Sequence, residues 1–133
     1  MNHIGEIYQS VIVSGSIDSK RVDALIDKKA NVNVLNYDFA IKIYDKKFLD
    51  KQFEKKVSYI HFTNKIKIKG IFVYGGLIIK GIKEAFSFFI TKEKFGTKVL
   101  VSIPALKKNG TRFDFVKDKI HFRRLSKRKG YWF

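Results

Sequence analysis

The chain has 133 residues, of which 45% are hydrophobic and 13 are phenylalanine, and it carries a formal net charge of +16. This length suits a single domain, and this apolar content supports a packed core, which excludes an intrinsically disordered chain. The absence of cysteine excludes a disulfide framework, thiolate catalysis and a thiolate zinc site. No apolar run approaches the roughly 20 residues of a membrane helix, and the first residues lack the basic start of a signal peptide. We therefore expect an intracellular, cytoplasmic protein that does not contact membranes.

The positive charge is distributed unevenly. Residues 1–40 hold four basic and five acidic side chains, whereas residues 41–133 hold 24 basic and seven acidic ones. A field of this sign attracts polyanions such as RNA. Lysines far outnumber arginines, and lysine is the less specific phosphate ligand, so a lysine-biased composition that only solvates the surface is the alternative.

Short strands dominate the first part of the chain. The apolar residues predict strands at Val11–Val13 and Val22–Ile26, with a turn over Gly15–Ser19, and a brief strand at Val32–Leu35. Asn36 then has the character of a helix N-cap. Helical spacing predicts one short helix from Tyr37 to about Lys46. The residues that carry this spacing are Phe39, Ala40, Ile43 and Tyr44.

The pattern then returns to a period of two. Ile66 and Ile68 alternate with lysines, so one strand face carries the ammonium groups of Lys65, Lys67 and Lys69. Gly70 permits a bend before the next strand. Gly75–Gly76 predicts a turn.

Further short strands complete the series. They are expected at Leu77–Ile79, Ala85–Ile90 and Val99–Val101, followed by a helical turn at Pro104–Lys108 and a hairpin of Phe113–Val116 with Ile120–Phe122. Many short strands without a β-α-β rhythm predict a mostly β, single-domain closed barrel with one or two short helices.

Two segments carry a resemblance to a known family. The first runs from Ala24 to Leu35 and reads Ala-Leu-Ile-Asp-Lys-Lys-Ala-Asn-Val-Asn-Val-Leu. The second runs from Val99 to Gly110 and is followed by Phe113-Asp-Phe and Ile120-His-Phe. Together, in this order and at this separation, they resemble the active-site loop and the C-terminal part of retropepsin-type aspartic proteases.

The resemblance implies a half-sized subunit with one catalytic aspartate, Asp27. In this family two carboxylates, one from each subunit of a homodimer, share a proton around a water molecule. A hydroxyl residue follows the aspartate and links the two loops, and the glycine after it lets backbone amides approach the carboxylates. A hairpin near Lys69–Gly76 stands where the family has its flap.

This sequence departs from the family at three positions. Lys28 replaces the hydroxyl residue, Lys29 replaces the glycine, and Ser102 stands where the second segment has a glycine. A homodimer would bring four ammonium groups beside two carboxylates, which favours ion pairing over a shared proton and opposes the symmetric pairing itself. We therefore expect Asp27 to be vestigial, with a structural role in capping its loop or pairing with a lysine.

Residues 123–133 form a basic and aromatic tail beyond the resemblance. Its cations are Arg123, Arg124, Lys127, Arg128 and Lys129, and its aromatic residues include Trp132. Cations for phosphates and flat rings for bases are what RNA binding uses. The alternative is a terminal strand that docks on the domain.

The sequence thus predicts a retropepsin-like domain over residues 1–122 and a tail over residues 123–133. We expect an inactive pseudoprotease reused as a structural or binding module that contacts RNA in a ribonucleoprotein complex such as a ribosome. Two alternatives stay open: a homodimeric endopeptidase using Asp27, and a module that holds an extended peptide in the former substrate groove. The three histidines lack metal-ligand spacing, so we expect no metal and no cofactor.

Overall fold

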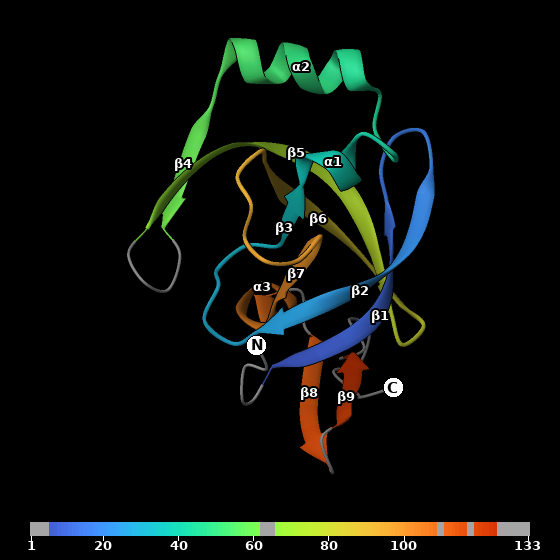
Figure 1. Ribbon diagram of the computed structural model, residues 1–133. Helices are drawn as coiled ribbons and strands as arrows, with labels where there is room; N and C mark the ends of the chain where they lie inside the picture. The colour runs from blue at the N-terminus through green and yellow to red at the C-terminus, as the bar shows by residue number, and fades with distance from the viewer. Residues whose placement is uncertain (1–5, 62–65, 109–110, 117–118, 125–133) are drawn as a thin grey trace.

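A closed ring of six strands forms the body of the protein (Figure 1). The computed structural model describes residues 6–61, 66–108, 111–116 and 119–124. The ring has the order β1-β2-β7-β3-β6-β5 and closes because β1 pairs with β5 as well as with β2. The strands of the ring are β1 (Ile7–Ser14), β2 (Ser19–Asp27), β3 (Val34–Asn36), β5 (Lys67–Ile79), β6 (Ile82–Thr91) and β7 (Val99–Ser102). The mostly β closed barrel expected from the sequence is confirmed.

Three more strands lie outside the ring. β4 (Ser58–His61) pairs with the first part of β5 and forms a hairpin that projects from the barrel. β8 (Thr111–Val116) and β9 (Lys119–Arg124) form a separate two-stranded sheet, as the predicted hairpin required. β9 continues through Arg123 and Arg124, two residues into the segment that we set apart as a tail.

The helical prediction was too long at its first site and missed a second one. α1 (Tyr37–Ala40) spans four residues, with Asn36 as its N-cap. A new helix, α2 (Lys46–Lys55), begins after Asp45, whose carboxylate accepts a hydrogen bond from the amide of Phe48. α3 (Ile103–Lys108) lies where a helical turn was predicted. The described residues therefore contain three helices, one more than expected.

The break between α1 and α2 has a local cause. Ile43 and Tyr44 are buried, as their spacing predicted. The carbonyl of Ile43, however, accepts a hydrogen bond of 3.0 Å from the amide of Ile17 in the β1–β2 turn. The chain has already left α-helical geometry at this point, because the amides of Lys42 and Ile43 donate to the carbonyls three residues back, and Asp45 then caps α2.

Gly75 and Gly76 do not form a turn, contrary to our prediction, because both lie within β5. A Cβ at Gly75 would clash with the hydroxyl of Tyr44 and lie 2.8 Å from ring carbons of Phe88. Glycine is thus needed there for close packing. The expected flap-like hairpin near Lys69–Gly76 is wrong for the same reason.

The chain reverses instead at Lys80 and Gly81. Ile79 pairs with Ile82, which leaves a two-residue turn in which both residues have positive φ, 50° for Lys80 and 78° for Gly81. Two-residue hairpin turns favour this conformation because it matches the right-handed twist of the flanking strands. A lysine followed by glycine is not a typical sequence for such a turn. The turn was therefore predicted at Gly75–Gly76 instead.

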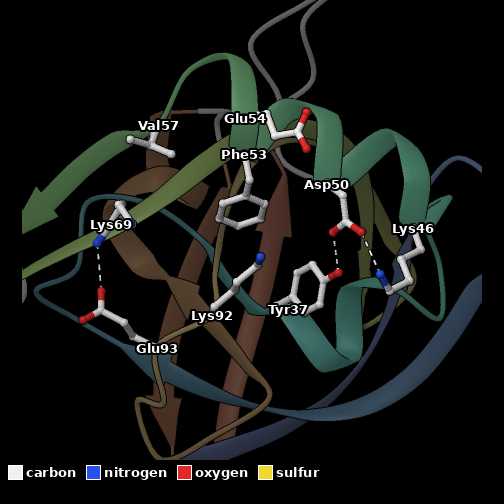
Figure 2. Close-up of a pocket in the computed structure, with 9 residues that line it drawn as sticks. All are labelled: Tyr37, Lys46, Asp50, Phe53, Glu54, Val57, Lys69, Lys92 and Glu93. Atoms are coloured by element: carbon white, nitrogen blue, oxygen red, sulfur yellow. Dashed lines mark hydrogen bonds and ion pairs between the residues drawn. The ribbon is translucent and has the colours of Figure 1, made fainter.

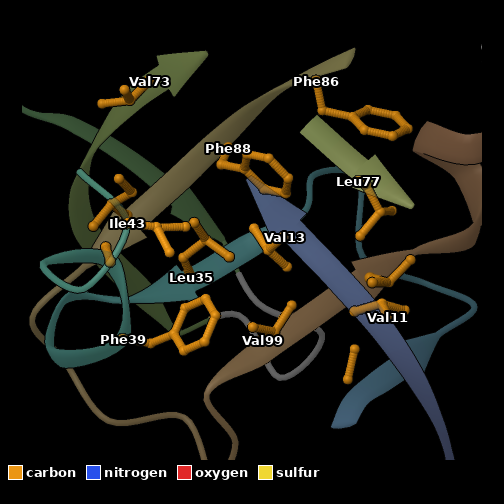
Figure 3. Packing of buried hydrophobic residues seen from close by; sticks show 14 of the residues in the cluster. Val11, Val13, Leu35, Phe39, Ile43, Val73, Leu77, Phe86, Phe88 and Val99 are labelled. Atoms are coloured by element: carbon orange, nitrogen blue, oxygen red, sulfur yellow. The ribbon is translucent and has the colours of Figure 1, made fainter. Parts of the chain in front are cut away.

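The core fills the barrel and reaches out under the helices (Figure 3). Val13, Leu35, Ile43 and Phe88 are all fully buried and come from four different segments. Burial raises the pKa of Tyr44 to about 12, so its hydroxyl stays protonated and donates to the carbonyl of Tyr74 at 2.7 Å. This bond ties the end of the α1 region to the middle of β5.

Candidate functional site: the Asp27 loop and its surroundings

The two sequence segments that carry the resemblance lie side by side. Asp27 is the last residue of β2, and the parallel pairing of β2 with β7 places it opposite Ser102. β3 pairs with β7 on its other side, with Val34 opposite Leu100. β7 therefore sits between the two strands that flank the Asp27 loop and fixes the position of that loop.

Asp27 caps its own loop. Its Oδ1 accepts hydrogen bonds from the amide of Lys29 at 2.7 Å and from the amide of Ala30 at 2.9 Å. Amides two and three residues after an aspartate are the usual partners of a side chain that fixes a turn. This structural role requires only a single copy of the chain. Lys28 and Lys29 are both exposed at the tip of the loop.

Ser102 links this loop to α3. The sequence reasoning missed this structural role. Its hydroxyl donates to the carbonyl of Ala30 at 2.5 Å and accepts from the amide of Ala105 at 3.0 Å. The second bond makes Ser102 the N-cap of α3. A serine directly before Ile103-Pro104 was the available signal, because proline is favoured in the first turn of a helix.

Asn33 supports the same junction from the other side. It is buried, and its side-chain oxygen accepts a hydrogen bond of 2.7 Å from the amide of Ser102. Its carbonyl accepts from the amide of Phe89 at 2.9 Å. Asn33 and Ser102 together connect the loop, β6, β7 and α3 through hydrogen bonds, so the loop is a rigid part of the barrel.

An apolar cluster packs between the loop and the projecting β4–β5 hairpin. Its buried members are Val34, Ile68, Phe89 and Leu100, with Leu25, Ala30, Val32, Ile60 and Phe95 packed against them. Ala30 and Val32 come from the loop, whereas Ile60 and Ile68 come from the hairpin. The hairpin thus packs on the loop through this cluster.

Several solved structures have a similar fold. A retropepsin-like aspartic protease from Rickettsia conorii superposes with a TM-score of 0.58 at 16% identity, covering 91% of this chain and 92% of that one. The retroviral protease-like domain of Ddi1 from Leishmania major gives 0.57 at 13%, covering 90% and 89%. The EIAV protease in complex with the inhibitor HBY-793 gives 0.55 at 10%, covering 81% and 91%. The chain has the retropepsin-like fold.

This assignment rests on structure, because no family model and no curated protein sequence matches the chain. The retropepsin-like fold suggested by the two sequence segments is thereby confirmed.

The cations that we predicted to bind RNA are only partly described. Lys67 and Lys69 are exposed on β5, and the buried Ile68 lies between them in the sequence. The ammonium of Lys67 lies 4.6 Å from the ring centroid of Tyr59 on β4. Arg123 and Arg124 belong to β9. Lys65, Lys127, Arg128, Lys129 and Trp132 lie outside the described residues.

A cavity of about 490 Å³ lies between α2 and the retropepsin-like barrel (Figure 2). Asp50 of α2 accepts hydrogen bonds from the hydroxyl of Tyr37 at 2.5 Å and from the ammonium of Lys46 at 2.7 Å. These bonds lower the pKa of Asp50, the bond from Lys46 having the largest effect. The ammonium of Lys92 lies 4.6 Å from the ring centroid of Phe53 and 4.9 Å from that of Tyr37. These contacts attach α2 to the barrel.

Among the described residues, no group of three or more histidine, aspartate or glutamate side chains could hold a metal ion. None of the helices found in the described ranges has the length and hydropathy needed to cross a membrane.

Proposed function

We propose that this chain is a retropepsin-fold module that does not cleave peptides and that contacts RNA, in a ribonucleoprotein complex such as a ribosome. The observation that carries the first half is the position of Lys28 and Lys29. They follow Asp27 directly and are exposed at the tip of its loop. A peptidase of this fold needs a second copy whose loop meets this tip, and the meeting would gather four ammonium groups around two carboxylates.

Elementary electrostatics opposes that arrangement. Two carboxylates act as an acid and base pair when they share one proton, which requires that cations do not hold both in the charged form. Like charges brought within a few ångströms repel by about 1 kcal/mol even in water and by more in a protein environment. The hydrogen bonds from Lys29 and Ala30 to Asp27 give this carboxylate a use that is independent of catalysis.

The charge distribution supports the second half of the proposal. The net charge of +16 concentrates after residue 40. On the described strands, Lys67 stacks on Tyr59 and Lys69 lies two residues further along β5. A cation beside an exposed aromatic ring is a common combination on surfaces that bind single-stranded RNA, where the cation meets a phosphate and the ring meets a base.

RNA binding by the purified chain tests this half of the proposal. We expect a fluorescein-labelled uridine homopolymer to bind with an affinity that falls steeply as salt rises, because binding releases counterions from the phosphates. Replacing the five tail cations, Arg123, Arg124, Lys127, Arg128 and Lys129, with glutamine should weaken binding and flatten the salt dependence. Replacing Lys65, Lys67 and Lys69 with glutamine should also weaken binding and flatten the salt dependence. An affinity that ignores both salt and these substitutions would exclude the RNA assignment.

One observation favours a second candidate, a homodimeric endopeptidase. The aspartate stands at the end of β2 in a fold whose three similar structures are described as proteases or as a protease-like domain. The two candidates differ in one measurable property, cleavage that depends on Asp27.

A further inference from the structure

Helix α2 carries three of its lysines in one column. Lys47, Lys51 and Lys55 recur every four residues, so they form one column along the helix, and all three are exposed. Asp50 and Glu54 are also four residues apart, and both line the cavity between α2 and the barrel (Figure 2). Asp50 is partly buried on the cavity side, Glu54 borders the cavity but is exposed, and the lysine column faces solvent.

The lysine column lowers the stability of the helix. Like charges four residues apart destabilise a helix by about 0.2–0.5 kcal/mol per pair, whereas alternating signs would stabilise it by a similar amount. Among the described residues, the one ion pair within α2 joins Lys46 to Asp50, on the cavity side. None of the three lysines in the column makes an ion pair with a carboxylate in the described part of the chain, so their ammonium groups are available to a polyanion outside the chain.

The apolar side of α2 decides between two kinds of polyanion. A basic helix that binds membranes inserts its apolar side into the lipid. Here Leu49 is fully buried, and Phe53 packs against the core. That side is therefore already occupied by the barrel. Phe48 alone presents a large apolar surface outward, with 41% of it exposed beside the lysine column. One outward ring suits stacking on a base better than insertion into a bilayer.

We propose that the outward face of α2, formed by Lys47, Lys51, Lys55 and Phe48, binds the phosphate backbone of single-stranded RNA. This inference rests on the proposed RNA-binding function and adds a surface that the sequence did not indicate. The helical rise places successive lysines about 6 Å apart along the axis, so the three ammonium groups follow a strand over about 12 Å. Phe48 stacks on a base beside this track.

Two matched triple variants test the surface. One is K47Q/K51Q/K55Q. The control is K94Q/K98Q/K107Q, which removes the same charge from exposed lysines outside α2. The probe is the labelled uridine homopolymer, and its binding is measured over a series of salt concentrations. The α2 variant should lower the slope of log affinity against log salt by about 2, because each lost phosphate contact on a single strand removes about 0.7. The control should change the slope by less than half of that.

Unfolding does not explain such a loss, because removing like charges relieves repulsion within α2. The thermal stability of the α2 variant should equal or exceed that of the natural chain. Phe48→Ala should lower the affinity while leaving the salt slope unchanged, since the ring carries no charge.

The outcomes separate the two proposals. If the natural chain does not bind the homopolymer, the proposed function fails and this inference fails with it. If it binds, and the α2 variant and the control behave alike, the RNA assignment stands and the α2 surface is wrong. A parallel assay uses vesicles of phosphatidylcholine and phosphatidylserine. Binding to vesicles that depends on α2, with RNA binding unaffected, would identify a membrane surface and overturn the inference.

Discussion

The hydroxyl of Ser102 donates a hydrogen bond of 2.5 Å to the carbonyl of Ala30, and it thereby joins the Asp27 loop to the first turn of α3. The same oxygen accepts the amide of Ala105. One small side chain thus satisfies a loop carbonyl and a helix amide at once. In the retropepsin-like pattern a glycine is expected at this place, and a glycine has no side chain that could make these hydrogen bonds.

Ser102→Ala should therefore destabilise the fold. The substitution removes the N-cap of α3 and leaves the partly buried carbonyl of Ala30 without the Ser102 hydroxyl, and we expect the free energy of unfolding to fall by about 1–3 kcal/mol. Urea denaturation measures the change. Ser87→Ala is the control, because Ser87 is exposed on β6 and should change stability by less than about 0.5 kcal/mol. Equal effects of the two substitutions would show that the Ser102 bonds contribute nothing.

Alanine substitutions at the neighbouring Gly75 and Gly76 should affect the free energy of unfolding differently. A Cβ at Gly75 meets the Tyr44 hydroxyl and the Phe88 ring, whereas a Cβ at Gly76 has Ser14 Cβ as its nearest neighbour, at 3.5 Å. Gly75→Ala should lower the free energy of unfolding by about 1–3 kcal/mol through overpacking. Gly76→Ala should be neutral or slightly stabilising, because alanine restricts the unfolded chain more than glycine does. A harmless Gly75→Ala would contradict the packing described here.

The stability of α2 should depend on pH through Asp50. Its pKa is lower in the folded protein, mainly because of the bond from Lys46. A lowered carboxyl pKa means that the contribution to stability is present above the ordinary value of 3.8 and is lost as the pH falls through the folded pKa. Amide hydrogen exchange in α2 should accordingly quicken in acid, before the barrel strands are affected.

Asp50→Asn should produce this loosening at neutral pH. Asp38→Asn is its control, because Asp38 is exposed in the first turn of α1. If exchange in α2 is the same in both variants, the Asp50 contacts do not hold the helix.

Much of the fold could be predicted from the sequence because burial and periodicity agree in the strands. Val11 and Val13 alternate with partly exposed neighbours, and Ile26 ends an apolar strand before a charged loop. The two family segments predicted the retropepsin-like fold because they occur in the order and at the separation that the family has. The strand predictions depended on local pattern alone.

The predictions that were wrong concern residues whose structure depends on contacts between distant segments. Glycine in sequence signals a turn, but Gly75 is required by Tyr44, which lies far away along the chain. The helix that was expected to run to Lys46 ends at Ala40, and the carbonyl of Ile43 bonds to the distant amide of Ile17. α2 was overlooked because its many lysines leave only a narrow apolar side, with Leu49 as its one buried residue, and the helical periodicity is therefore weak. The N-cap role of Ser102 was overlooked because the position was read only as a departure from the family.

Peptide cleavage tests the central claim most directly. The natural chain and Asp27→Asn are incubated with a mixed peptide library across the acidic range, and products are identified by mass spectrometry. A third variant, K28T/K29G, restores a hydroxyl and a glycine after Asp27. We predict that the natural chain and Asp27→Asn give identical, background product profiles. Cleavage by the natural chain that disappears in Asp27→Asn would contradict the account, whereas cleavage confined to K28T/K29G would trace the loss of activity to the two lysines.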